Sequence, residues 1–201
     1  IIGDTANDNF GKTVSLSADG KIVAIGAPKF GPDATEKGQV KVFEYNNNSW
    51  TGIGTMSAGS VGDLFGSTVS LSADGKTVAI GSIGGDSTTG GNQNNGYVLV
   101  YEYNGSFWSV LGNQINGESS NDKSGYSLSL SANGKILAIG APYNDETGQD
   151  AGHVRIYIYD NTNNLWRLLG IDIDGESSGD LSGWSVSLSA DGMYLAIGAP
   201  D

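Results

Sequence analysis

The feature that most constrains this chain is a ten-residue phrase that occurs four times. It begins at Gly11 as Gly-Lys-Thr-Val-Ser-Leu-Ser-Ala-Asp-Gly and returns in variant form at Gly66, Gly125 and Gly183, at intervals of 55, 59 and 58 residues. Each copy runs into an apolar stretch that ends in Ile-Gly. A fixed period of this length indicates a repeat architecture, in which one supersecondary unit is used several times.

A second phrase follows the first in three of the copies. It reads Gly-x-Val-x-(Val/Ile)-(Phe/Tyr)-x-Tyr and begins at Gly38, Gly96 and Gly152. A tryptophan comes next, and a glycine stands four residues after it, as in Trp50 and Gly54. We interpret each such tryptophan as a core residue between neighbouring repeats. The equivalent positions are Trp50, Trp108 and Trp166.

Each repeat predicts four β-strands. In the first copy, residues 14–17 alternate apolar and Ser, residues 22–26 are apolar on both faces, and residues 40–45 are β-branched and aromatic. Residues 18–21 form a hairpin turn in which Gly20 supplies a positive φ, and Trp50 opens the fourth strand. No window has a helical period.

Four antiparallel strands per repeat are typical of a propeller blade. We therefore predict an all-β fold, a β-propeller of four-stranded antiparallel blades with about 3.5 blades present. The chain forms a single repeat domain over residues 1–201, with repeats of approximately 1–54, 55–112, 113–170 and an incomplete 171–201. A linear β-solenoid is the alternative, and it ranks second because solenoids usually repeat at shorter periods.

Two short motifs resemble the FG-GAP repeat, the repeat of integrin-α-like propellers and of many microbial and algal surface proteins. They are Gly-Ala-Pro, as at Gly26–Pro28, and Phe-Gly, as at Phe10–Gly11. The resemblance covers nearly the whole chain. It implies a seven-bladed propeller and a non-catalytic adhesion or scaffold module, extracellular or at the cell surface. Three features depart from the family pattern: Ser124 and Ser182 replace the Phe, Gly81-Ser82-Ile83 replaces Gly-Ala-Pro, and the calcium loop of the family is too short here to supply six to eight oxygens.

Carboxylates gather on the connections that open on one face of the predicted propeller. This acidic face, which could hold calcium or a calcium-bridged ligand, comprises Asp4, Asp8, Asp63, Glu118, Asp122, Asp174, Glu176 and Asp180 on one set of connections, and Asp33, Glu36, Asp86, Asp145, Glu146, Asp150 and Asp201 on the other. We place the best candidate metal ligands at Asp145 and Asp150. The alternative is that these carboxylates are simply solvated, and that Asp8, Asp63, Asp122 and Asp180 cap their own turns.

Two candidate glycosylation sites lie on the opposite face, in turns between the third and fourth strands. They are the sequons at Asn47 and Asn104. A three-residue motif in a chain rich in Asn and Ser is weakly specific, so plain turn residues are the alternative.

Composition and motifs narrow the function further. The net charge of −12 argues against nucleic acid, no apolar stretch is long enough to span a bilayer, and the absence of cysteine excludes thiolate chemistry. We find no catalytic motif and interpret the single histidine, His153, as a residue at a strand end. The sequence thus predicts no enzymatic activity.

The expected partner is a protein or a glycan, bound through the acidic face. A carbohydrate-binding, lectin-like propeller is the first alternative, for which Trp184 gives a hint, and a propeller attached to a hydrolase is the second. Further blades are expected from a longer parent chain or from another subunit.

Overall fold

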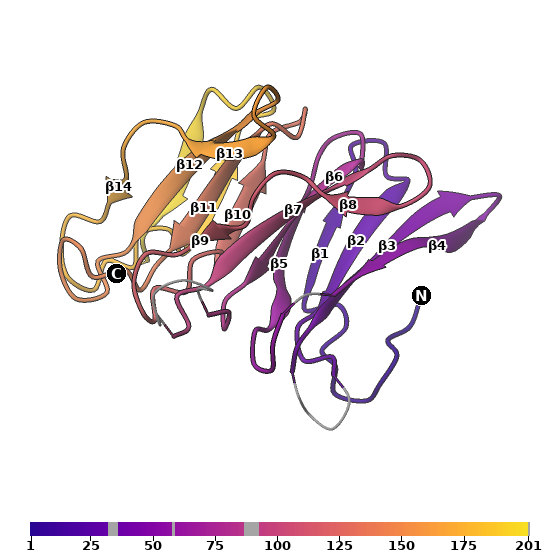
Figure 1. The fold of residues 1–201 in the computed structure, drawn as a ribbon, viewed down its shortest axis with the longest axis horizontal. Helices are drawn as coiled ribbons and strands as arrows, with labels where there is room; N and C mark the ends of the chain where they lie inside the picture. The colour runs from indigo at the N-terminus through magenta and orange to yellow at the C-terminus, as the bar shows by residue number, and fades with distance from the viewer. Residues whose placement is uncertain (32–35, 58, 87–92, 201) are drawn as a thin grey trace.

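The computed structural model describes residues 1–31, 36–57, 59–86 and 93–200, and it is built from strands (Figure 1). The first repeat forms one antiparallel sheet in the order β1-β2-β3-β4, and the next two repeats form sheets of the same order, β5-β6-β7-β8 and β10-β11-β12-β13. The first sheet contains β1 (Thr13–Leu16), β2 (Ile22–Ala27), β3 (Gln39–Asn46) and β4 (Ser49–Met56). The second contains β5 (Phe65–Leu71), β6 (Thr77–Ser82), β7 (Tyr97–Tyr103) and β8 (Trp108–Val110).

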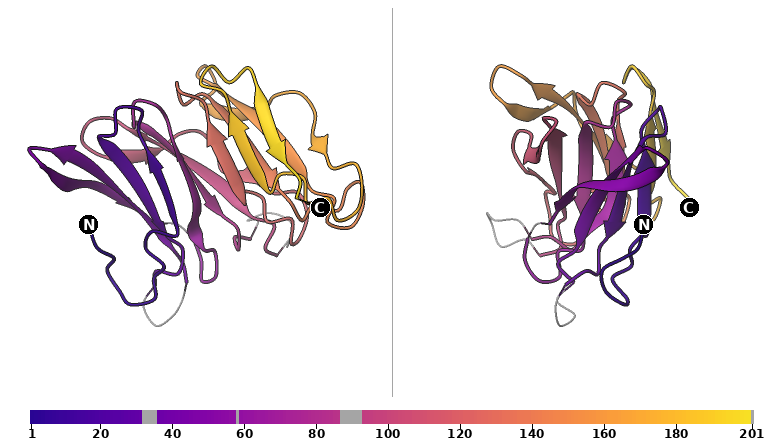
Figure 2. Two further views of the ribbon diagram at one scale, coloured as in Figure 1. Left: turned by 180° about the vertical axis from the view of Figure 1, so that it is seen from behind. Right: turned by 90° about the vertical axis from the view of Figure 1, so that its right-hand side faces the viewer.

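The third sheet and a two-stranded fourth sheet complete the described fold. The third contains β10 (Ser127–Leu130), β11 (Ile136–Ala141), β12 (His153–Asp160) and β13 (Leu165–Leu168), and the fourth contains β15 (Ser185–Leu188) and β16 (Leu195–Gly198). The sheets stand side by side in chain order, from indigo to yellow (Figure 1, Figure 2). Sequential four-stranded sheets are propeller blades and not turns of a solenoid, so the predicted fold class is confirmed.

Neighbouring blades are joined at their first strands, β1, β5, β10 and β15. In each of the first three blades a serine in the first strand accepts a hydrogen bond from a backbone N–H of the next blade. The pairs are Leu71 N to Ser15 Oγ at 2.9 Å, Leu130 N to Ser70 Oγ at 3.0 Å, and Leu188 N to Ser129 Oγ at 2.8 Å. The serines of the repeated phrase therefore hold the blades in register.

The Ile-Gly at the end of each second strand marks a close approach between blades. A Cβ built at Gly26 would lie 2.2 Å from the backbone oxygen of Gly66, and one at Gly140 would lie 2.1 Å from that of Gly183. Both oxygens belong to the repeated phrase of the next blade. Only glycine allows the two backbones to approach this closely.

Apolar side chains are buried between the blades. One cluster, between the first and second blades, includes Val40, Phe65 and Ile80, and another, between the second and third, includes Leu137 and Trp166. The interpretation of the tryptophans as core residues is confirmed for Trp166, which is 3% exposed, and for Trp108, which packs against the first cluster; Trp50 is 37% exposed. No helix in the described ranges is long and apolar enough to cross a membrane.

Candidate functional site

Two very short strands bring the connections between blades against the third strand of a blade. β9 (Ile115–Asn116) pairs with β7, and β14 (Ile173–Asp174) pairs with β12. In the second pairing His153, the first residue of β12, stands opposite Asp174. This register places the carboxylates around β14 beside the histidine.

Four side chains from four separate segments converge here. Glu118 follows β9, Glu146 lies between β11 and β12, His153 begins β12, and Asp172 precedes β14. One ligand-type atom from each of these residues lies within 4.8 Å of every other. We call this group the His153 cluster; it joins the connection leaving the second blade to loops of the third.

Arg155 organises the carboxylates of the His153 cluster. It lies two residues after His153 in β12, and alternate residues of a strand share a face. Its Nε and Nη2 donate to Asp172 Oδ2 at 2.9 and 2.7 Å, and Nη2 also pairs with Glu118. When the imidazole is neutral, the three carboxylates of the cluster and the guanidinium of Arg155 together carry a formal charge of −2.

The imidazole of His153 is buried and incompletely satisfied. The side chain is 2% exposed, and Nδ1 has no hydrogen-bond partner among the described residues. Asp172 Oδ2 and Asp174 Oδ1 each lie 4.0 Å from Nδ1, which is too far for a hydrogen bond. Burial, with the nearby Arg155 guanidinium, lowers the pKa of His153 despite the opposing effect of Asp172, Glu118 and Asp122, so the ring is neutral at pH 7.

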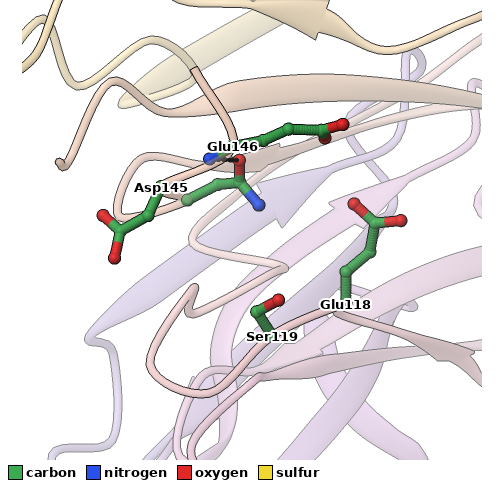
Figure 3. Close-up of a pocket in the computed structure, with 5 residues that line it drawn as sticks. Glu118, Ser119, Asp145 and Glu146 are labelled. Carbon is green, nitrogen blue, oxygen red and sulfur yellow. Dashed lines mark hydrogen bonds between the residues drawn. The ribbon is translucent and has the colours of Figure 1, made fainter. Parts of the chain in front are cut away.

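A pocket of about 370 Å³ opens beside the cluster and is lined by Glu118, Ser119, Asn144, Asp145 and Glu146. In Figure 3 the carboxylates of Glu118 and Glu146 lie toward the same side of the pocket, whereas that of Asp145 points away from them. The volume is within the range of pockets that hold small molecules. Two of the four cluster residues therefore face a space that a ligand can enter.

A buried carboxylate connects two residues that line the pocket. Asp122, 1% exposed, accepts hydrogen bonds at Oδ2 from Ser119 N at 2.9 Å and from Asn144 Nδ2 at 3.0 Å. Burial raises the pKa of Asp122, although these two donors act in the opposite direction. These bonds fix both sides of the pocket relative to each other.

Neither of the two predicted metal ligands, Asp145 and Asp150, belongs to this cluster. Asp145 Oδ1 accepts a hydrogen bond from Asp150 N at 2.7 Å, across the loop between β11 and β12. The carboxylate that joins the cluster from this loop is that of Glu146. The metal assignment of Asp145 and Asp150 stays a prediction.

The turn-capping role of four repeated aspartates is confirmed. Asp8, Asp63, Asp122 and Asp180 each accept a hydrogen bond from a backbone N–H three or four residues earlier in the chain. Of the other acidic-face residues, Asp33 and Asp201 lie outside the described residues.

Asn47 and Asn104 lie exposed in the turns before β4 and β8. Asn104 Oδ1 accepts hydrogen bonds from the backbone N–H groups of Ser106 and Phe107 at 2.9 and 3.0 Å. Both positions are open to solvent, and their glycosylation stays a prediction.

The interpretation of His153 from the sequence missed its surroundings. It does begin a strand, with Arg155 two residues further along the same strand. Asp172 lies near it because β14 pairs with β12, and Glu118 reaches it from the connection after β9; no local motif announces either approach. The one available signal was that β12 begins His-Val-Arg where the equivalent β3 begins Gln-Val-Lys. Trp184, the hint of a glycan pocket, packs on Tyr126 with ring centroids 4.8 Å apart.

Comparison with known proteins establishes the fold. No protein-family model matches the chain, and no curated protein matches it in sequence. Among similar solved structures is a candidate 6-phosphogluconolactonase from Bacteroides fragilis, with a TM-score of 0.53 and 18% identity, over 80% of this chain and 38% of that one. Another is a candidate 6-phosphogluconolactonase from Bacteroides uniformis, with a TM-score of 0.59 and 14% identity, over 98% of this chain and 45% of that one. A third is Saccharomyces cerevisiae Sqt1, with a TM-score of 0.52 and 13% identity, over 83% of this chain and 36% of that one. The chain thus spans less than half the length of these proteins.

These findings correct four of the expectations above. The resemblance to FG-GAP, integrin-α-like repeats is wrong, because no family model matches and the similar structures named here are not integrin-like. The expected adhesion or scaffold module, its lectin-like alternative and the expected absence of enzymatic activity are overturned by neighbours described as lactonases. Gly-Ala-Pro misled because its glycine has a packing role between blades here: a Cβ at Gly26 would lie 2.2 Å from the backbone oxygen of Gly66. The glycine of the second Phe-Gly has a similar role, since a Cβ at Gly66 would lie 2.8 Å from the backbone oxygen of Gln39. The extracellular location stays a prediction.

Proposed function

We propose that this chain carries the active site of a β-propeller hydrolase that opens an uncharged lactone or a similar small ester. The observation that carries the proposal is the His153 cluster beside a pocket of about 370 Å³, where three carboxylates, a neutral buried imidazole and an arginine meet. Titratable groups that converge at a pocket are typical of active sites. The two bacterial neighbours described as 6-phosphogluconolactonases support the same reaction class.

Lactone hydrolysis requires little beyond an activated water. The water oxygen bonds to the carbonyl carbon, the ring C–O bond breaks, and the proton lost by the water ends on the alcohol that forms. A carboxylate at the pocket wall can carry that proton, and general-base catalysis of this kind contributes about 10²–10⁴-fold to rate. Glu118 and Glu146 line the pocket and stand in the right place for this role.

The charge of the site selects against a phosphorylated substrate. The pocket is lined by the acidic residues Glu118, Asp145 and Glu146. Arg155, the cation that contacts the cluster, is already paired with Asp172 and Glu118. A phosphate dianion would meet a negative potential there. We therefore expect the substrate to be neutral, unlike the substrate named for the bacterial neighbours.

The test is a hydrolysis assay with the chain and two substrates, glucono-1,5-lactone and its 6-phosphate, each corrected for spontaneous opening. We expect turnover of the neutral lactone with a higher kcat/KM, and a loss of about 10²-fold or more in the Glu146→Gln variant. Glu44→Gln is the matched control, since Glu44 is an exposed glutamate in β3 of the first blade. Wild-type rates equal to the spontaneous rates, or a Glu146→Gln rate equal to that of wild type, would refute the proposal.

A further inference from the structure

We infer that Glu118, Glu146, His153 and Asp172 form a binding site for one divalent transition-metal ion, Zn²⁺ or Mn²⁺. The inference rests on the proposed function, because the ion would lie at the wall of the same pocket. It differs from the calcium expectation in both the ligands and the metal.

The first argument is the unsatisfied nitrogen of His153. Nδ1 is buried, has no hydrogen-bond partner among the described residues, and lies 4.0 Å from Asp172 Oδ2. If Nδ1 carries a lone pair, that lone pair faces carboxylate oxygens; if it carries a proton, the proton is out of hydrogen-bond range. A buried nitrogen without a hydrogen-bond partner is unfavourable, and a cation between the ring and the carboxylates would give it a partner.

The second argument is the spacing of the four ligand atoms. All lie within 4.8 Å of one another. Two ligands on opposite sides of a cation, each at about 2.0–2.4 Å, are separated by roughly 4–5 Å. The cluster is therefore already close to the dimensions of a coordination sphere and needs little rearrangement to close on an ion.

The third argument is charge. With a neutral imidazole and the Arg155 guanidinium, the three carboxylates of the cluster leave −2, and Asp174 Oδ1 adds a further negative charge 4.0 Å from Nδ1. Arg155 holds Asp172 and Glu118 from one side, as partners outside the coordination sphere commonly do for metal ligands. One divalent ion would neutralise the charge of −2 and leave only the additional charge of Asp174.

The donor set selects the metal. Imidazole suits Zn²⁺ and similar ions, whereas Ca²⁺ and Mg²⁺ prefer oxygen ligands alone. One nitrogen and three carboxylates therefore favour Zn²⁺ or Mn²⁺. Such an ion would place a positive charge beside the pocket, where it can polarise an ester carbonyl.

The test is a calorimetric titration of the chain, free of any affinity tag and stripped with EDTA, with Zn²⁺, Mn²⁺ and Ca²⁺ in turn and without substrate. We expect one equivalent of Zn²⁺ or Mn²⁺ to bind more tightly than Ca²⁺. Glu146→Gln and His153→Gln should each weaken binding by at least about tenfold, because even losing a group that only supports a ligand costs about 10–100-fold. His153→Gln should also reduce the preference for Zn²⁺ over Ca²⁺.

Two variants separate this site from other carboxylates. Glu44→Gln is the control for adventitious surface binding, and Asp145→Asn tests the neighbouring loop; both should bind Zn²⁺ as wild type does. The inference is overturned if no transition metal binds stoichiometrically, if Glu146→Gln binds like wild type, or if Asp145→Asn abolishes binding. Since His153 is buried, its variant is first compared with wild type by thermal melting, and the exposed Glu146→Gln decides if His153→Gln does not fold.

The two proposals can fail separately. Stoichiometric metal binding without lactone hydrolysis would refute the proposed function but not the metal site. If EDTA-stripped protein binds no Zn²⁺ in the titration and hydrolyses the lactone at the same rate with and without added Zn²⁺, the metal site is refuted and the hydrolase proposal stands.

Discussion

Gly54 and Trp108 belong to different repeats and lie in contact across the boundary between two blades. A Cβ at Gly54 would be 2.3 Å from Trp108 Cδ1, and one at Gly112 would be 2.9 Å from Trp166 Cδ1. The recurring Trp-x-x-x-Gly is thus not a contact within one repeat. Its glycine makes room for the tryptophan of the following blade, which explains why the two residue types recur together.

This contact predicts the effect of adding a single methyl group. Gly54→Ala should destabilise the protein by about 1–3 kcal/mol, because a new Cβ overlaps a ring held by the rest of the core. Gly52→Ala is the control in the same strand, where the nearest atom is 3.8 Å from the new Cβ. It should be neutral or stabilise by up to about 1 kcal/mol through the unfolded chain. Urea unfolding measures both, and equal effects would contradict the explanation.

At the level of elements, the hairpins between the first and second strands follow the sequence closely. Gly20, Gly75, Gly134 and Gly192 have φ values of 73°, 70°, 68° and 73°, which confirms the predicted positive-φ turns. In the first copy Asp19 Oδ1 accepts hydrogen bonds from Ser17 Oγ at 2.7 Å and Lys21 N at 3.0 Å. The Ser-x-Asp-Gly phrase therefore closes its own turn, and local chemistry of this kind can be predicted from sequence.

The same hairpins predict a difference between equivalent glycines. Gly20→Val should cost about 1–3 kcal/mol from backbone strain alone, since the nearest atom to its Cβ is 4.0 Å away. Gly75→Val should cost more, by an additional 1–3 kcal/mol or so, because its Cβ would lie 2.6 Å from Ile22 Cβ of the preceding blade. Denaturant midpoints of the two variants check this. An unchanged midpoint for Gly75→Val would refute the turn assignment.

What the sequence could and could not predict follows from the range of the interactions. Strand periodicity and turn residues are local and repeat four times, so the strands of the first blade fall within about a residue of their expected limits. The His153 cluster depends on β14 pairing with β12 and on loops that differ between repeats. Neither has a local pattern. The capping aspartates were predictable because each binds its own turn, whereas the partners of Glu146 come from other segments of the chain.

At the level of the whole molecule, the net charge is −12, and some of the carboxylates that contribute to it are buried. Most carboxylates are solvated, but Asp63 is only 5% exposed and accepts hydrogen bonds from Ser60 N at 2.8 Å and Tyr97 Oη at 2.9 Å. Burial raises the pKa of Asp63, as does the charge of Asp86, and the two donors only partly oppose this. Ionisation of Asp63 therefore places a poorly solvated negative charge inside the fold.

Asp63 should consequently make the stability of the protein depend on pH. Its folded-state pKa lies above the unfolded value, so its contribution is fully present below about pH 3.8 and is lost as the pH rises through the folded pKa. Asp63→Asn has no carboxyl at this position and so does not lose this stability as the pH rises. The melting temperature of the variant, relative to that of wild type at the same pH, should therefore be higher at about pH 7 than at about pH 3.5. Tyr97→Phe should act in the opposite direction: removing the hydroxyl donor raises the pKa of Asp63 further and enlarges the loss at neutral pH. A difference in melting temperature that is constant with pH in both variants would show that Asp63 does not titrate with folding.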